Sequence, residues 1–133
     1  MPYHVLMLGY RKPTLSPEEF YTHYENIHIP LVKSLAGASF PMLHTRRYIQ
    51  RFGAKERGDN FPALLLSGSQ QDFDYDVIIE LSFESEAAFY KFGNIMAEPD
   101  VQAIVAGDCD KFMDQVRSKA AVLSSIETTM VES

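Results

Sequence analysis

Apolar and polar residues alternate most regularly over residues 75–83, YDVIIELSF, which we expect to form a β-strand. Val77, Ile79 and Leu81 would lie on one face of this strand and the intervening residues on the other. Three further segments are rich in β-forming residues and are bounded by turn-forming residues, which predicts three more strands. These segments are residues 3–10, 42–52 and 119–130. The arginines of the segment 42–52 favour a place at the edge of a sheet.

The chain after the first strand carries the signals of a helix start. Ser16 can cap the N-terminus, Pro17 suits the first helical position, and Glu19 completes a capping box. We therefore expect a helix to begin at Pro17.

The apolar residues of this helix predict its buried face and its end. Phe20, Tyr24 and Ile27 recur at helical spacing and would face the interior. Pro30 disfavours helical backbone at the residue before it. We therefore expect one helix to end there and a second short helix to run from Pro30 to Gly37.

The second half of the chain repeats this order of elements. A helix over residues 86–96 follows the strand at 75–83, and a short helix over residues 99–106 comes next. Asp108 or Asp110 can cap a further short helix.

The predicted order is β-α-β-β-α-β, which is the order of the ferredoxin-like fold. We expect one α+β domain over residues 1–133, with a four-stranded antiparallel sheet covered by helices on one face. Large exposed apolar surface is unusual in a soluble monomer, so a homodimer formed through the open sheet faces is the simplest arrangement. The segment 53–74 is long for so small a domain and could be a lid, an interface or disordered.

Composition narrows the classes of partner and compartment. The formal net charge is −6 without a basic block, which argues against a nucleic acid and against an anionic membrane surface. No apolar run reaches the length of a membrane span, and the N-terminal segment has the pattern of a strand rather than a signal peptide. Cys109 is the single cysteine, so we expect a fold without an internal disulfide in a reducing compartment, the cytoplasm.

The sequence has no strong signature of a cofactor or metal site. Gly-rich phosphate-binding motifs, HExxH and paired cysteines do not occur in it. His23 and His28 would lie about 140° apart around a helix, too far to converge on one ion. We therefore expect neither a cofactor nor a metal.

Tyr24 and His28 remain as candidates for acid–base chemistry. They are spaced i and i+4, which places them on one helix face. His28 would lie at a helix C-terminus, where carbonyl groups favour the protonated imidazole. An imidazole that titrates near neutral pH is a natural proton carrier, but a helix-terminal histidine is also often a simple charge complement.

Four further side chains could complete or flank this site. Asp76 and Glu80 share one face of a strand, and His4 begins the first strand with its orientation left open. His44 lies on a strand face that could be a pocket wall or an interface. His23 points away from Tyr24 and is expected to be exposed.

Several motifs in order resemble the EthD family of dimeric α+β barrels. The stretch RKPTLSPEEFYTHYENIHIPLV is similar to the family's opening signature, with Tyr24 at an aromatic position and His28 and Pro30 in its His-x-Pro. The stretch DYDVIIELSFESEAAFYKF resembles the strand and helix of its second half. The stretch GDCDKFMD resembles its Asp-x-x-x-Phe segment at Asp108 and Phe112.

The resemblance implies a ferredoxin-like subunit, a sheet-to-sheet homodimer and a pocket between sheet and helices. Within the family, the sequence most resembles fungal-type EthD decarboxylases and dehydratases, which modify polyketides without a cofactor. This resemblance implies a lyase for an aromatic polyketide or polyphenol, in which His28 is the general acid/base and Tyr24 holds a phenol or carbonyl oxygen. Asp76, Asp108 and His4 would orient the imidazole or the substrate. The alternatives are a cofactor-free monooxygenase or cyclase of the same fold, and a non-catalytic dimer that binds a small ligand.

Overall fold

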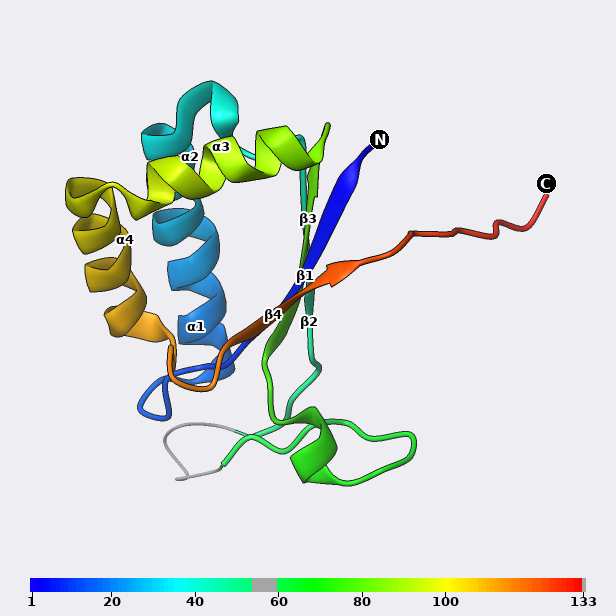
Figure 1. Ribbon diagram of the computed structural model, residues 1–133. Helices are drawn as coiled ribbons and strands as arrows, with labels where there is room; N and C mark the ends of the chain where they lie inside the picture. The colour runs from blue at the N-terminus through cyan, green and yellow to red at the C-terminus, as the bar shows by residue number, and fades with distance from the viewer. Residues whose placement is uncertain (54–59, 133) are drawn as a thin grey trace.

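A computed structural model describes residues 1–53 and 60–132 of the chain. Its four antiparallel strands form one sheet in the order β2-β3-β1-β4. The strands are β1 (Tyr3–Gly9), β2 (Leu43–Tyr48), β3 (Val77–Phe83) and β4 (Lys119–Leu123). The helices cover one face of the sheet and leave the other open (Figure 1). The predicted ferredoxin-like α+β fold is therefore confirmed, with β2 at an edge.

The helices come in two groups that follow β1 and β3. The first group is α1 (Pro17–His23), the π-helical turn η1 (Tyr24–His28), α2 (Ile29–Ala36) and the short 3-10 helix η2 (Gly37–Ser39). The second group is α3 (Glu86–Ala97) and α4 (Pro99–Phe112), and a further 3-10 helix, η4 (Gln70–Phe73), precedes β3. Among the described helices, none is long and apolar enough to cross a membrane.

The predicted capping box forms at the start of α1. The amide of Glu19 donates to the Ser16 hydroxyl over 3.1 Å, and the Glu19 carboxylate accepts from the Ser16 amide over 2.8 Å. These two bonds satisfy amides that the first helical turn leaves without partners. The start of the helix at Pro17 is thus set by local sequence.

The expected break before Pro30 is wrong, because the chain runs on as one continuous helix. His28 and Ile29 both have right-handed helical backbone, and the amide of Ile29 bonds to the carbonyl of Tyr24. That bond spans one residue more than an α-helical bond and makes a wider π turn. Pro30 has no amide hydrogen to donate, and its ring crowds the preceding helical turn. The wider π turn makes room for the ring and does not need the missing hydrogen bond.

The π turn also changes which side chains face the interior. Phe20, Tyr24 and His28 are buried, whereas Ile27 is 50% exposed. The expectation of a buried Ile27 is wrong because it assumes the uniform period of an α-helix. The extra residue in the turn brings His28, rather than Ile27, to the face that packs on the sheet.

The last helix and the last strand also differ from expectation. α4 is a single helix from Pro99 to Phe112 in place of two short ones, so Asp108 lies within it and does not cap a helix. β4 ends at Leu123, opposite His4, and does not extend to residue 130. Because β1 begins at Tyr3, the chain beyond Leu123 has passed the end of its partner strand and projects from the body (Figure 1).

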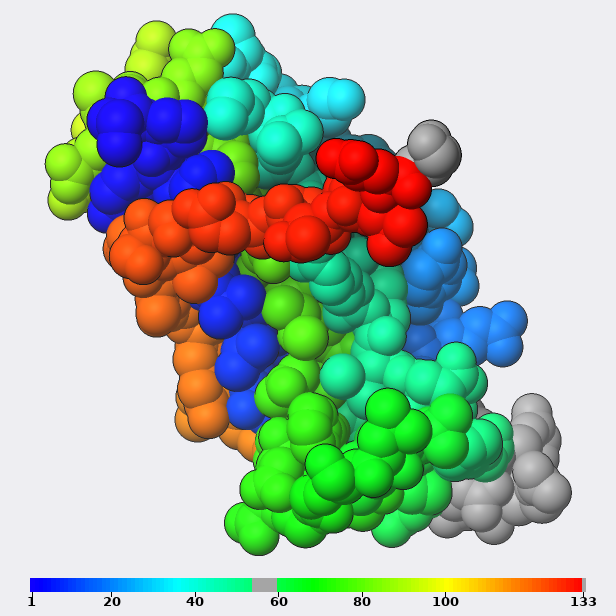
Figure 2. Space-filling model, turned by 90° about the vertical axis from the view of Figure 1, so that its right-hand side faces the viewer, coloured from blue at the N-terminus to red at the C-terminus, as the bar shows by residue number. Residues whose placement is uncertain are grey.

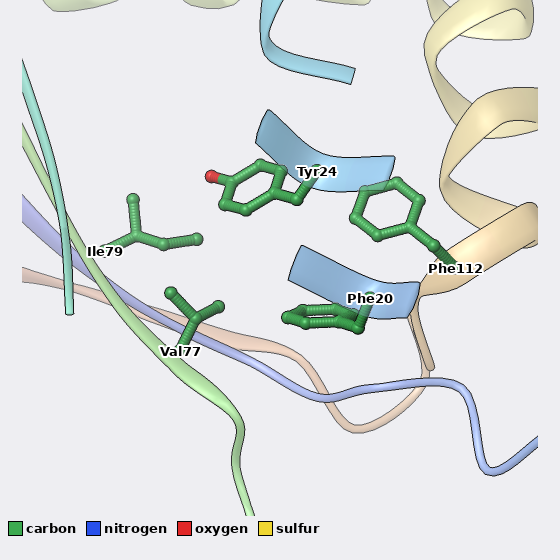
Figure 3. Close-up of a cluster of buried hydrophobic side chains, with 5 residues drawn as sticks. All are labelled: Phe20, Tyr24, Val77, Ile79 and Phe112. Atoms are coloured by element: carbon green, nitrogen blue, oxygen red, sulfur yellow. The ribbon is translucent and has the colours of Figure 1, made fainter. Parts of the chain in front are cut away.

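A small aromatic and aliphatic core fixes the helices on the sheet. It consists of Phe20, Tyr24, Val77, Ile79 and Phe112 (Figure 3). The rings of Phe20 and Phe112 lie 5.6 Å apart between α1 and α4. Burial of each such side chain contributes about 1.5–3 kcal/mol, so this cluster holds α1, α4 and β3 in a defined relation.

The open face of the sheet has an apolar patch at its centre, next to the Arg47–Glu80 ion pair. Strand register places Leu6 and Leu8 of β1 on this face, beside Ile78 of β3 and Ala121 of β4. Figure 2 views this face, with the projecting C-terminal residues in front of it. Residues 60–74 lie at one end of the same side (Figures 1 and 2), and the remainder of the expected loop, residues 54–59, lies outside the described residues.

Gly9 at the end of β1 tests how tightly the sheet and helices pack. A Cβ at this position would lie 2.7 Å from Cγ1 of Val77, a fully buried side chain that has no room to move. We expect Gly9→Ala to lower the free energy of unfolding by about 1–3 kcal/mol, measured by urea denaturation. Gly93→Ala in α3 is the matched control, because its Cβ meets open space and alanine favours a helix by about 1 kcal/mol. Equal stabilities of the two variants would contradict this packing.

Candidate active site

A cavity of about 320 Å³ lies between the helices and the covered face of the sheet. Its wall is mainly apolar, with contributions from β1, β3, α2, α3 and α4. Apolar lining residues include Met7, Ile79, Leu81, Phe92 and Met96. The ionisable side chains of the wall are Tyr24, His28, His44 and Cys109. A concave, mainly apolar space with a few polar groups is the usual form of a small-molecule site.

His28 lies on this wall with its two ring nitrogens in different surroundings. Nδ1 lies 2.8 Å from Oδ2 of Asp108 in a buried contact, and Nε2 lies 3.7 Å from the Cys109 sulfur. A carboxylate only accepts hydrogen bonds, so Nδ1 carries the hydrogen and Nε2 has a free lone pair. The imidazole is therefore held as a base at the cavity wall.

His23 binds the other oxygen of the same carboxylate. Its Nε2 lies 3.0 Å from Oδ1 of Asp108, and its ring stacks on Phe112 with centroids 4.6 Å apart. The expectation of an exposed His23 is wrong, because α4 supplies a carboxylate between the two histidines. No group of three or more His, Cys, Asp or Glu side chains in the described ranges could hold a metal ion.

The charges of this cluster follow from burial and hydrogen bonding. Burial alone would raise the pKa of Asp108, but hydrogen bonds from His28 and His23 bring it below its usual value. Burial lowers the pKa of His28, and the contact with Asp108 opposes only part of this effect. The imidazole is therefore neutral near neutral pH. The expected protonation by a helix end is wrong, because the chain continues into α2 and leaves no free carbonyl end at His28.

Cys109 lies beside His28 as a neutral thiol. Burial, with the nearby charges of Asp108 and Asp110, raises its pKa to about 11. A thiol with such a pKa is a poor nucleophile at neutral pH and can only donate weakly to Nε2 of His28.

Tyr24 and His44 form a second polar pair on the wall. The Tyr24 oxygen lies 3.1 Å from Nε2 of His44, which projects from β2. Burial, followed by the positive charge of Arg46, lowers the pKa of His44 to about 4. Burial raises the pKa of the Tyr24 hydroxyl well above its usual value of 10.0. Both groups are therefore uncharged near neutral pH.

An ion-pair network beside His44 fixes this part of β2. Arg46 donates to Glu25 from Nε over 3.0 Å and from Nη2 over 2.5 Å, and its Nη1 donates to the His44 carbonyl over 2.8 Å. Tyr48 also donates to the Glu25 carboxylate. From the sequence, the face of β2 that carries His44 could be a pocket wall or an interface. In the structure, His44 on this face is part of the cavity wall.

Two of the candidates from the sequence lie away from the cavity. Asp76 accepts from Nε of Arg11 over 3.1 Å and from Nε of Arg51 over 2.8 Å, and so ties the end of the sheet to the segment before β3. His4 pairs with the Ser82 hydroxyl over 2.8 Å, and strand register places both on the open face. Of the sequence candidates, the structure brings Tyr24, His28 and Asp108 together and places His44 on the cavity wall, and it adds His23 and Cys109.

Comparisons with known proteins agree with this fold. Residues 12–116 match the model of the EthD domain. The chain is 28% identical over 120 residues to dehydratase ustZ of Ustilaginoidea virens, covering 87% of this chain and 78% of that protein.

Two solved structures share the fold at low sequence identity. An EthD family protein from Bacillus halodurans has a TM-score of 0.54 at 16% identity, covering 93% of this chain and 99% of that one. A dimeric ferredoxin-like protein of unknown function from Thermobifida fusca has a TM-score of 0.51 at 14% identity, covering 92% and 90%. The matched segment includes the cavity residues Tyr24 and His28 and the Asp108 partner of His28, and on this match the chain belongs to the EthD family.

Proposed function

We propose that this protein is a cofactor-independent lyase that acts on an aromatic polyketide or polyphenolic substrate, with His28 as the general base. The observation that carries the proposal is the position of His28 on the wall of an apolar cavity, with its Nδ1 held by the buried Asp108. The similarity to a protein named dehydratase favours loss of water over loss of carbon dioxide as the reaction.

The proposed role of His28 follows from its protonation state. Its Nε2 is unprotonated near neutral pH and can accept a proton from a substrate in the cavity. The Asp108 carboxylate then stabilises the imidazolium that forms, and the ring later returns the proton to the leaving group. His23 keeps this carboxylate ionised by its own hydrogen bond.

The remainder of the cavity suits a small polycyclic substrate. Its volume lies near the lower end of the ~300–1,000 Å³ that is common for ligand pockets. Apolar side chains such as Met7, Leu81 and Phe92 would contact the rings and exclude water from the reacting carbon. Tyr24 supplies a neutral hydroxyl for a substrate oxygen.

Removal of the base should abolish most of the activity. We expect His28→Gln and His28→Ala to lower turnover by about 10²–10⁴-fold, because each removes the proton acceptor. Products from a panel of polyphenolic acids and hydroxylated aromatic ketones, with and without oxygen, would be measured by mass spectrometry. Loss of water supports dehydration, loss of carbon dioxide a decarboxylase, and gain of oxygen an oxygenase.

The matched control for this experiment is His4→Gln, which changes a histidine outside the cavity. We expect it to retain turnover close to that of the wild type. Full turnover by both His28 variants on a substrate that the wild type converts would exclude His28 as the base. A panel with no product of any kind would favour a non-catalytic ligand-binding protein.

The fall in activity at low pH should report the pKa of His28. Burial lowers its pKa below the usual 6.5, so the basic form persists at neutral pH and is lost as the pH falls through the lowered pKa. We expect kcat/KM to be flat near pH 7 and to fall about tenfold per pH unit below an apparent pKa under 6.5. Asp108→Asn removes the group that raises this pKa, so its acid limb should move to lower pH. A limb at or above 6.5 would contradict the assignment.

We also propose that the protein is a homodimer formed through the open sheet faces. The apolar centre of this face, around Leu6, Leu8 and Ile78, would be covered by a second copy. We expect sedimentation to give a dimer at micromolar concentration and Ile78→Glu to give a folded monomer. Ile104→Glu is the matched control, because Ile104 is 47% exposed on α4, away from the sheet. A wild-type monomer at this concentration would refute the dimer.

A further inference from the structure

Tyr24 lies between two neutral histidines on the cavity wall. Its ring centroid is 5.9 Å from that of His28 and 6.0 Å from that of His44. Figure 3 shows its hydroxyl pointing from the helix towards the sheet, which is where His44 projects from β2. The function proposed above uses His28 and Tyr24 and gives no role to His44.

His44 has one ring nitrogen within hydrogen-bond distance of Tyr24 and one without a hydrogen-bond partner among the described residues. Nε2 lies 3.1 Å from the Tyr24 oxygen, whereas Nδ1 is buried without a hydrogen-bond partner among the described residues. A neutral imidazole carries its hydrogen on one nitrogen only, so the two tautomers leave different groups unpaired. One leaves a buried N–H donor at Nδ1, and the other leaves only a lone pair there.

The tautomer with hydrogen on Nε2 is the better one for this site. Buried N–H donors without an acceptor are rare in native structures, and acceptors with spare lone pairs are more common. With hydrogen on Nε2, His44 donates to the Tyr24 oxygen, and the Tyr24 hydroxyl hydrogen cannot point back at His44. That hydrogen is then available to an acceptor in the cavity that Tyr24 lines.

We propose that His44 is a positioning residue that holds the Tyr24 hydroxyl as a hydrogen-bond donor for a carbonyl oxygen of the substrate. This inference rests on the proposed function. It assigns opposite tautomers to the two histidines of the wall, with hydrogen on Nδ1 in His28 and on Nε2 in His44. The cavity then presents one proton acceptor and one hydrogen-bond donor to the same ligand.

A base beside a donor selects a β-hydroxy ketone on an aromatic ring system as the substrate class. His28 Nε2 takes the proton from the carbon between the carbonyl and the hydroxyl-bearing carbon. The electron pair of that C–H bond forms a C=C bond to the carbonyl carbon, the carbonyl π pair moves to the oxygen, and the resulting enolate oxygen accepts a hydrogen bond from Tyr24. The carbonyl then re-forms, a C=C bond forms, the C–O bond breaks, and the hydroxide leaves as water with the proton from His28. One water is lost and the protein is unchanged.

The tautomers can be measured on the wild-type protein without a substrate. Two-bond ¹⁵N–¹H correlation spectra of ¹⁵N-histidine-labelled protein distinguish a protonated ring nitrogen from a bare one. We expect His44 to carry its hydrogen on Nε2 and His28 on Nδ1 at pH 7, with His44→Gln and His28→Gln used for assignment. A His44 hydrogen on Nδ1 would overturn the proposal.

A ketone probe tests whether the donor reaches the ligand. 1-Tetralone can accept a hydrogen bond but cannot donate one to His28, and tetralin is the matching hydrocarbon without the oxygen. We expect the wild type to bind tetralone about tenfold more tightly than tetralin, as is typical of one hydrogen bond. The bound carbonyl stretch, read from the ¹²C–¹³C infrared difference, should lie at lower frequency than in Tyr24→Phe.

Variants of His44 separate positioning from packing. His44→Leu should lose most of the tetralone-to-tetralin ratio and part of the infrared shift, because Tyr24 is no longer held. His44→Gln places an amide N–H near the position of Nε2 and should restore both. Equal ratios and frequencies in the wild type, His44→Leu and Tyr24→Phe would overturn the proposal. Turnover is not used in these measurements, so their failure is distinct from failure of the lyase assignment.

Discussion

The double hydrogen bond to Asp108 is the contact on which the site depends. One carboxylate from α4 binds His23 and His28, which belong to successive turns of the first helical run. It therefore fixes the tautomer of His28 and also joins two helices that reach the cavity from opposite halves of the chain. The buried imidazole of His28 and the buried carboxylate of Asp108 would each be costly alone, and together with the half-buried His23 they satisfy one another.

The π turn is what makes this contact possible. It rotates the helix so that Phe20, Tyr24 and His28 share the interior face, and it lets the chain pass Pro30 without breaking. Helices with such turns commonly have them at functional sites, and here the turn contains two of the residues that line the cavity. The proline thus has a geometric role that differs from simple helix termination.

Features set by local sequence could be predicted, and features set by tertiary contacts could not. The strand over 77–83 and the Ser16–Glu19 capping box each depend on near neighbours, and both form as expected. The position of His23 depends on a carboxylate 85 residues further along the chain, which no spacing rule contains. The length of β4 depends in the same way on where its partner β1 begins.

The buried neutral histidines also tie the stability of the fold to pH. An unfolded chain protonates His28 and His44 near the usual value of 6.5, but the folded protein resists this because burial lowers the pKa of both, to about 4 for His44. The unfolded state therefore binds more protons in this window, and the stability present above pH 6.5 is lost as the pH falls towards 4. The wall that keeps a base unprotonated for chemistry thereby gives the protein an acid limit for its own folding.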